Sequence, residues 1–189
     1  MKRLIAIIKA GAKEAPAYLI VLYLIFFVLD SYTTYLASPD LKYEGNWIVR
    51  KYNLGWEGII IKDLIIFTTV TTSVIVTLNF LPGYLRVHDF SSYKKLIFHF
   101  FRDIKLFLSL IVLGIFYSHL INLAHIIVNN YLGHIYFHWP KGWVKDISEY
   151  YILRQKYFLF YIQYCLVVPG YIIAIMKIKS IWKKVVLVK

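Results

Sequence analysis

Four long apolar runs restrict the possible folds of this chain more than any other feature of its sequence. A helix that crosses a bilayer needs about 20 predominantly apolar residues, and runs of that length cover residues 15–36, 58–81, 104–131 and 157–176. Hydrophobic residues make up 60% of the 189-residue chain, more than one soluble core of this size would bury. We therefore predict an all-α fold, a polytopic membrane helical bundle of four transmembrane helices that forms one integral membrane domain over residues 1–189.

The 22 Lys and Arg residues are unevenly divided between the connections, and this division predicts the orientation of the chain. The N-terminal segment, the second loop and the C-terminal segment hold four, five and five of them, whereas the first and third loops together hold seven. Short loops rich in Lys and Arg stay in the cytoplasm. We therefore expect both termini and the second loop to be cytoplasmic, in a multi-pass protein of a prokaryotic cytoplasmic membrane. The net charge of +12 then reflects topology and contact with membrane lipids, and we expect no nucleic-acid binding.

Residues 91–105, between the second and third runs, combine basic residues with leucine, isoleucine and phenylalanine. Ser91 or Ser92 can cap a helix at the start of this segment. One interpretation is an interfacial amphipathic helix that leads into the third span. The other is a simple extension of the third span into the cytoplasm, and the sequence does not decide between them.

Residues 132–151 are rich in His, Trp and Tyr, which suit the headgroup region of a membrane because one end of each ring stays hydrated. We interpret His134 and His138 as interfacial side chains. Pro140 and Gly142 mark a turn before the fourth span.

Two further features belong to the fourth span. Cys165 is the only cysteine, so no disulfide forms within the chain, and its apolar surroundings predict a buried, inert thiol. The pair Pro169-Gly170 predicts a kink or a close approach by another helix.

Polar side chains inside membrane spans are costly and usually face protein or water rather than lipid. Three of the predicted spans carry such groups at a similar depth, in their outward halves. The groups are Asp30 and Thr34 in the first span, Lys62 in the second, and His119, Asn122 and His125 in the third, with Glu44 and Asn46 just above them in the first loop. Asp63 and Asn129 lie beside members of this set. The shared depth predicts an outward-facing polar cluster built from three helices.

The cluster allows two interpretations. In the first, Asp30 and Lys62 form a buried ion pair while histidines and asparagines hydrogen-bond between helices, so that the cluster only fixes their packing. In the second, it lines a ligand pocket open to the outer side or outer leaflet, which includes the case of a catalytic centre. We expect no metal, because His119 and His125 are six residues apart and do not share one helix face. We expect no haem or other cofactor, because no other span carries a histidine to oppose them.

The pattern around the first two spans resembles a widespread group of small, uncharacterised multi-pass membrane proteins of bacteria and archaea. That group shows Asp-x-x-x-Thr at the end of the first span, Glu-x-Asn-Pro in the following loop, and often a Lys early in the second span. The matching positions here are Asp30, Thr34, Glu44, Asn46 and Lys62, and the segment that contains them covers about a fifth of the chain. Trp47 replaces the usual proline. The resemblance implies a membrane protein with an outward-facing polar site, and it implies no activity.

These observations predict a non-enzymatic integral membrane protein, a small subunit or scaffold of a membrane complex. Its expected partners are membrane lipids and either other membrane subunits or further copies of itself. The alternative is a binder or transporter-like module for a small or lipid-like ligand at the outer leaflet. A third and less favoured possibility is a lipid-modifying enzyme that uses His119 or His125 as base, with Asp30 or Glu44 as its partner.

Overall fold

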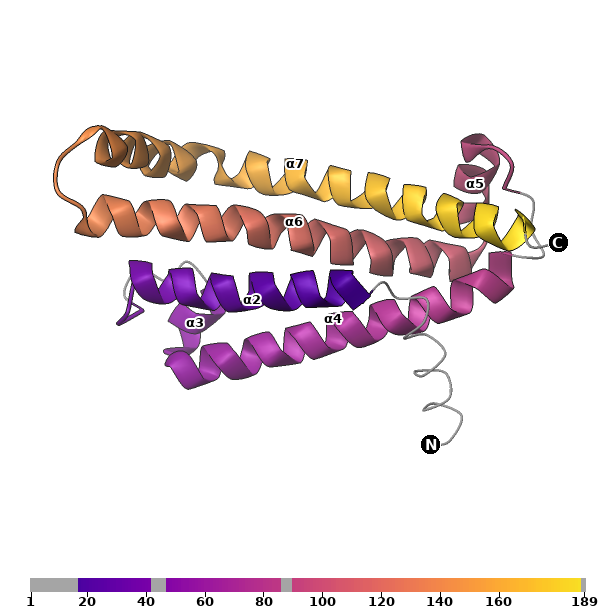
Figure 1. Ribbon diagram of the computed structural model, residues 1–189, viewed down its shortest axis with the longest axis horizontal. Coiled ribbons are helices and arrows are strands. Elements are labelled where there is room, and N and C mark those ends of the chain that lie inside the picture. Colours follow the sequence, from indigo (N-terminus) through magenta and orange to yellow (C-terminus); the bar gives the residue numbers. More distant parts are fainter. Residues whose placement is uncertain (1–16, 42–46, 86–89, 188–189) are drawn as a thin grey trace. The chain divides into compact units, whose positions relative to one another are not determined.

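The computed structural model describes residues 17–41, 47–85 and 90–187, and every regular element in these ranges is an α-helix (Figure 1). Side chains are described in the same ranges except at 17, 47, 48, 50, 151–164, 186 and 187. The helices are α2 (Ala17–Ala37), α3 (Trp47–Tyr52), α4 (Trp56–Leu85), α5 (Tyr93–Phe100), α6 (Ile104–His138) and α7 (Trp143–Leu187).

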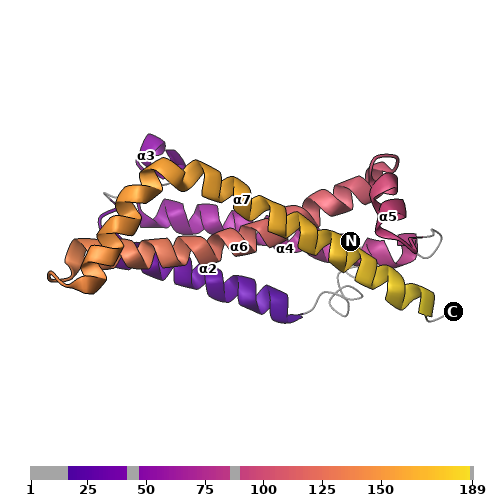
Figure 2. The same ribbon diagram turned by 90° about the horizontal axis from the view of Figure 1, so that it is seen from above.

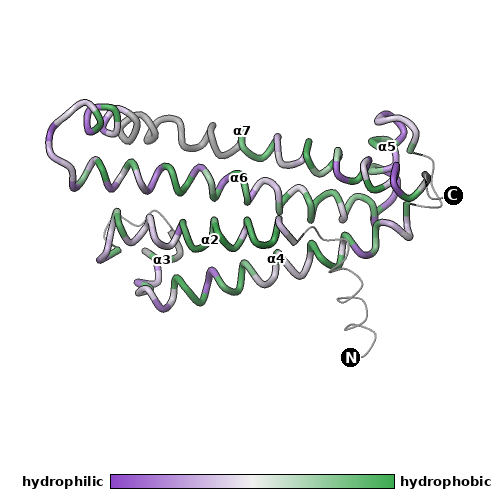
Figure 3. The backbone as a smooth tube through the Cα atoms, viewed as in Figure 1, coloured by the Kyte–Doolittle hydropathy of each residue, from purple (hydrophilic) through white to green (hydrophobic). Residues whose placement is uncertain are grey.

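Within the described residues, four helices are long and apolar enough to cross a membrane, which confirms the predicted number of spans. The candidate spans are Tyr18–Ala37, Trp56–Leu85, Ile104–His138 and Cys165–Val185. Figure 3 shows apolar residues along α2, α4 and α6 and hydrophilic residues at the turn that follows α6.

The last two helices differ in length from the prediction. α6 continues beyond the expected end at residue 131 and stops at His138, shortly before Pro140, because a proline disfavours the helical conformation of the residue before it. The residues after α6 form bends around Pro140 and Gly142, as the sequence predicted. α7 has 45 residues and is roughly 68 Å long, about twice the thickness of the hydrocarbon core. Its candidate span among the described side chains is Cys165–Val185, and the predicted start at residue 157 lies among residues whose side chains the structure does not describe.

The chain forms two compact units, and α2, α4, α6 and α7 each contribute one part to both. Unit 1 comprises Met1–Val21, Thr69–His119 and Leu166–Lys189, and unit 2 comprises Leu22–Thr68 and Leu120–Cys165. The contacts of each unit are described in turn.

In unit 2, α2 packs between α4 and α6 (Figure 1). The side chain of Tyr23 on α2 is almost fully buried, and its ring stacks on that of Phe67 on α4 with the centroids 5.0 Å apart. Near the end of α2, a Cβ placed at Gly133 of α6 would lie 4.0 Å from the Cβ of Ala37. Aromatic stacking therefore joins α2 to α4, whereas small residues allow α2 to approach α6.

In unit 1, α6 and α7 approach each other closely where both carry small residues. A Cβ added to Gly170 would lie 2.7 Å from the Cα of Ser118, and one added to Gly114 would meet the ring of Tyr171. The hydroxyl of Ser118 donates to the carbonyl of Val167 at 3.0 Å, a backbone group near Pro169. The predicted close approach at Pro169-Gly170 is confirmed, and α7 continues through the proline.

The segment that follows the second span is a separate helix, α5, rather than an extension of α6 (Figure 2). Asp103 lies just before α6, where its Oδ1 accepts hydrogen bonds from the backbone nitrogens of Lys105 (2.9 Å) and Leu106 (3.2 Å). The hydroxyl of Tyr84, near the end of α4, donates to Oδ2 of the same carboxylate. Asp103 therefore caps α6 and ties its start to the end of α4.

We expect the Asp103→Ala variant to lose about 1–2 kcal/mol of stability, because the first turn of α6 loses its cap and Tyr84 loses its acceptor. The free energy of unfolding, measured by SDS titration in mixed micelles, tests this. Asp146→Ala is the matched control, since Asp146 is an exposed carboxylate in the first turn of α7. Equal losses in the two variants would contradict the capping role of Asp103.

Cys165 corrects a prediction, because the structure places it exposed on the surface of α7 rather than buried. In a membrane helix both the lipid-facing and the protein-facing residues are apolar. An apolar neighbourhood in the sequence therefore does not indicate which side of the helix is covered by protein.

Candidate functional site: a polar cluster between α2 and α6

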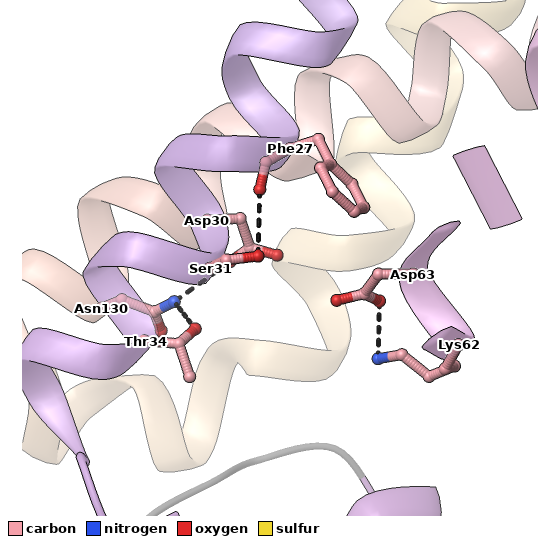
Figure 4. Close-up of polar contacts among 7 residues, drawn as sticks. All are labelled: Phe27, Asp30, Ser31, Thr34, Lys62, Asp63 and Asn130. Carbon is pink, nitrogen blue, oxygen red and sulfur yellow. Dashed lines mark hydrogen bonds and ion pairs between the residues drawn. The ribbon is translucent and has the colours of Figure 1, made fainter. Parts of the chain in front are cut away.

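The side-chain amide of Asn130 on α6 forms the centre of a polar cluster in unit 2 (Figure 4). Its Nδ2 donates to Oγ1 of Thr34 at 2.8 Å and to Oδ1 of Asp30 at 3.2 Å. Asp30 and Thr34 are four residues apart on α2, which places them on one helix face. We call Asp30, Thr34 and Asn130 the Asn130 cluster.

Neighbouring hydroxyls on α2 are used within that helix. Thr33 donates to the carbonyl of Leu29 at 2.9 Å, and Ser31 donates to the carbonyl of Phe27 at 3.3 Å. Such bonds to the preceding turn satisfy a hydroxyl without joining two helices. Thr34 is the member of this polar stretch whose hydroxyl accepts from another helix.

One turn after Asn130, His134 makes a second polar contact between α6 and α2. Its Nδ1 lies 2.8 Å from the carbonyl oxygen of Leu36. Because a carbonyl oxygen only accepts hydrogen bonds, Nδ1 is the protonated donor in this contact. Leu36 is in the last turn of α2, where carbonyl groups have no partner inside the helix. The ring of His134 also lies 5.0 Å from that of His138. His134 therefore caps the end of α2, a contact that its interpretation as an interfacial side chain did not include.

Lys62 on α4 forms an ion pair with its sequence neighbour Asp63, with Nζ and Oδ1 2.9 Å apart (Figure 4). Both side chains are about one-fifth exposed, at 21% and 18%. A compact pair within one helix lowers the cost of placing both charges in a membrane segment. The Asp63 carboxylate also lies within electrostatic range of Tyr23 on α2.

Three polar residues of α6 lie on a different face from Asn130. Asn122, His125 and Asn129 follow one another at intervals of three and four residues, so they form one stripe along the helix. Among the residues that the structure describes, the Oδ1 atoms of Asn122 and Asn129 are buried without a hydrogen-bond partner. Such acceptors are uncommon in native proteins and call for a physical explanation.

The eight residues predicted from the sequence therefore have different outcomes. Asp30 and Thr34 come together through Asn130, whereas Lys62 pairs with Asp63. Asn122 and His125 lie in unit 2 on the neighbouring stripe of α6, and His119 belongs to unit 1. Glu44 and Asn46 lie outside the described residues.

Two residues of this site, Asn130 and His134, were not in the predicted cluster. They are four residues apart, and that spacing is a sequence signal for one helix face. The predicted polar neighbour was Asn129, and a shift of one residue rotates the side chain by about 100° around the helix.

The described residues contain no group of three or more His, Cys, Asp or Glu side chains that could hold a metal ion. The chemistry available at the Asn130 cluster is hydrogen bonding by an amide, a hydroxyl and a carboxylate. Such groups can fix two helices or orient a polar ligand.

With four helices able to cross a membrane and a polar cluster joining two of them, the chain has the features of a multi-pass helical membrane protein. No protein-family model, curated protein or solved structure matches it. The similarity of residues 30–63 to small prokaryotic membrane proteins therefore rests on its motif residues alone.

Proposed function

We propose that this chain is a non-enzymatic membrane protein that serves as a small subunit or scaffold of a membrane complex. The observation that carries the proposal is the low coverage of α2 and α4 by the rest of the chain. Only 11% of the apolar window of α2 and 17% of that of α4 is buried, compared with 39% for α6. Two long helices thus offer most of their surface to lipid, to a second copy or to another membrane subunit.

The side chains that α2 presents favour a protein partner. Tyr18, Tyr32 and Tyr35 are 68%, 57% and 54% exposed. Tyrosine supplies a large rigid ring and a hydroxyl that can hydrogen-bond across an interface, and it is enriched at protein–protein contacts. The Asn130 cluster and His134 meanwhile hold α2 against α6, so this surface is presented in a fixed orientation.

A photo-crosslinking experiment tests the subunit proposal. A benzophenone side chain replaces Tyr32 on α2 or, as a control, Ile115 on α6, which is similarly exposed at 50%. We expect protein adducts from position 32, either with a second copy or with another membrane protein, and mainly lipid adducts from position 115. The proposal would be rejected if the chain were monodisperse with one copy per nanodisc and gave no protein adducts at position 32.

The proposal includes both termini in the cytoplasm of a prokaryotic cell, with the Asn130 cluster toward the outer side. Support comes from the exposed charges of the two units. In the described part of unit 1 they are basic, and include Lys94, Lys95, Arg102, Lys105, Lys183 and Lys184. In unit 2 they are mixed, and include Asp40, Lys51, Glu57, Lys141, Asp146 and Glu149. Short connections rich in Lys and Arg stay in the cytoplasm, so the basic charges of unit 1 support a cytoplasmic location for its exposed connections.

Reporter fusions after Lys189 test the orientation. A cytoplasmic C-terminus should give a fluorescent GFP fusion and an inactive alkaline phosphatase fusion, because the phosphatase needs an oxidising compartment to form its disulfides. The opposite pair of results would place the C-terminus outside.

A second candidate function is a binder of a small or lipid-like ligand at the outer leaflet. Its support is the stripe of Asn122, His125 and Asn129, where two buried acceptors lack a partner among the described residues. A ligand with N–H or O–H donors would satisfy them. The described residues add no observation that favours the lipid-modifying alternative, and we do not propose it.

Native mass spectrometry tests this second function. A co-purifying molecule should be lost from the Asn122→Leu/Asn129→Leu double variant. It should be retained in Asn79→Leu, since Asn79 bonds to the Ile75 carbonyl of its own helix at 2.8 Å. The same ligand occupancy in both variants would reject the site.

A further inference from the structure

The short helix α5 has two apolar faces, and the chain covers only one of them. Leu96 and Phe100 are 0% and 4% exposed and form the covered face. Ile97, Phe98 and Phe101 are 44%, 51% and 82% exposed. A soluble helix that packs on a protein core needs one apolar stripe, so the second stripe needs another explanation.

The helix is firmly anchored on its covered side. The hydroxyl of Ser92 accepts from the backbone nitrogen of Lys95 at 3.2 Å and caps the first turn. Lys179 of α7 is 4% exposed, and its Nζ donates to the carbonyl of Phe90 just before the helix. The same ammonium lies 4.5 Å from the ring of Trp182 and 5.5 Å from that of Tyr93, both within cation–π range. These contacts fix which face of α5 points away from the protein.

The outward face combines apolar and cationic groups. Lys94, Ile97, Phe98 and Phe101 follow the i, i+3, i+4, i+7 pattern, which places a lysine on the same stripe as three apolar side chains. The guanidinium of Arg102 lies 4.1 Å from the centre of the Phe98 ring. The cations therefore border the apolar patch directly.

The neighbouring acidic residue accepts hydrogen bonds from other groups of unit 1. Asp103 is engaged by Tyr84 and by the backbone at the start of α6. Lys183 and Lys184, near the end of α7 in the same unit, are also exposed. The apolar patch of α5 thus belongs to a unit whose exposed charges, among the described residues, are basic.

We propose that α5 is a membrane-binding site for anionic phospholipid. In this arrangement Ile97, Phe98 and Phe101 enter the boundary between headgroups and acyl chains, while Lys94 and Arg102 contact lipid phosphates. Apolar burial combined with cation–phosphate attraction is how amphipathic helices hold to anionic bilayers. Charge complementarity favours this occupant over a protein, because interface cores are depleted in lysine. The proposal adds a lipid-specific site to the subunit or scaffold function and does not depend on it.

The position of α5 is tested with the full-length chain in nanodiscs of phosphatidylcholine and phosphatidylglycerol. A nitroxide is attached at Ile97→Cys or, as a water-exposed control, at Lys141→Cys, each in a Cys165→Ser background. We expect the label at 97 to collide with oxygen more than with a water-soluble nickel complex, and the label at 141 to show the reverse. A label at 97 that is as accessible to nickel as the one at 141, or shielded from both reagents, would overturn the proposal. The second result would assign the face to protein.

The preference for anionic lipid is tested by removing two charges at a time. Spin-labelled lipids measure how strongly the chain prefers phosphatidylglycerol to phosphatidylcholine. In the Lys94→Gln/Arg102→Gln variant this preference should fall by a factor of about five or more relative to the parent chain. Lys51→Gln/Lys141→Gln removes the same net charge from exposed positions in unit 2. This second variant should retain most of the preference for phosphatidylglycerol. An equal decrease in both variants would show that the preference depends on net charge alone, and it would reject the site.

Discussion

Replacement of Gly170 by alanine should destabilise the chain by about 3 kcal/mol, at the upper end of what overpacking usually costs. The added Cβ would lie 2.7 Å from the Cα of Ser118 and still closer to its backbone nitrogen and hydroxyl. Real Cβ atoms essentially never approach that closely. Because the obstacle is the backbone of α6, the two helices must separate, and the bond from Ser118 to the Val167 carbonyl is then lost.

The other helical glycines provide a graded control for this effect. At Gly114 the added methyl group would meet the ring of Tyr171, a side chain that can rotate away, so Gly114→Ala should cost less. At Gly83 nothing lies within 4 Å of the added group, and Gly83→Ala should be neutral or stabilising by up to about 1 kcal/mol. Free energies of unfolding from SDS titration test this order, and a Gly170→Ala variant as stable as Gly83→Ala would contradict the helix contact.

We expect the second largest effect, a loss of about 1–3 kcal/mol, from Asn130→Leu. The substitution removes the donor that Asp30 and Thr34 share, and it leaves a carboxylate oxygen and a hydroxyl oxygen short of a hydrogen bond. Hydrogen bonds between membrane helices average only about 0.6 kcal/mol. We expect a larger value here because one acceptor is a carboxylate.

Asn129→Leu is the matched control for that prediction. It makes the same change one residue away, at a side chain whose Oδ1 is buried without a partner among the described residues. Replacing an unsatisfied polar group by an apolar one should be neutral or stabilising. A thermal melt in detergent compares the variants, and the result would count against the Asn130 cluster if Asn129→Leu were the less stable of the two.

The number of spans could be predicted from the sequence because the hydropathy of a span is summed over some 20 residues, and one polar residue hardly changes that sum. The ends of the helices were less predictable. Whether residues 91–105 formed a separate helix depended on Asp103, whose carboxylate caps α6 and binds Tyr84 from a distant part of the chain. The Tyr84 contact, across 19 positions, has no local sequence signature.

The polar cluster shows a similar limit. The sequence predicted that Asp30 and Thr34 belong to a polar cluster shared between helices, and the structure joins these residues to a second helix. The choice between Asn129 and Asn130 depended on the rotation of α6, which is set by packing at Gly133 and Ala37. Lys62 forms its ion pair with Asp63, the adjacent residue in the sequence.

The bond from Lys179 to the Phe90 carbonyl has a consequence for the order in which the protein matures. The two residues are 89 positions apart, so the ribosome makes α6 and most of α7 between the synthesis of α5 and that of the lysine that secures it. Until α7 has been inserted, α5 is held by its own cap and by local packing, and its lipid-facing side chains are available to the nascent membrane surface. The C-terminal helix therefore acts late in assembly, and a chain that stops before Lys179 would leave the end of unit 1 unfinished even with α2, α4 and α6 already in the bilayer.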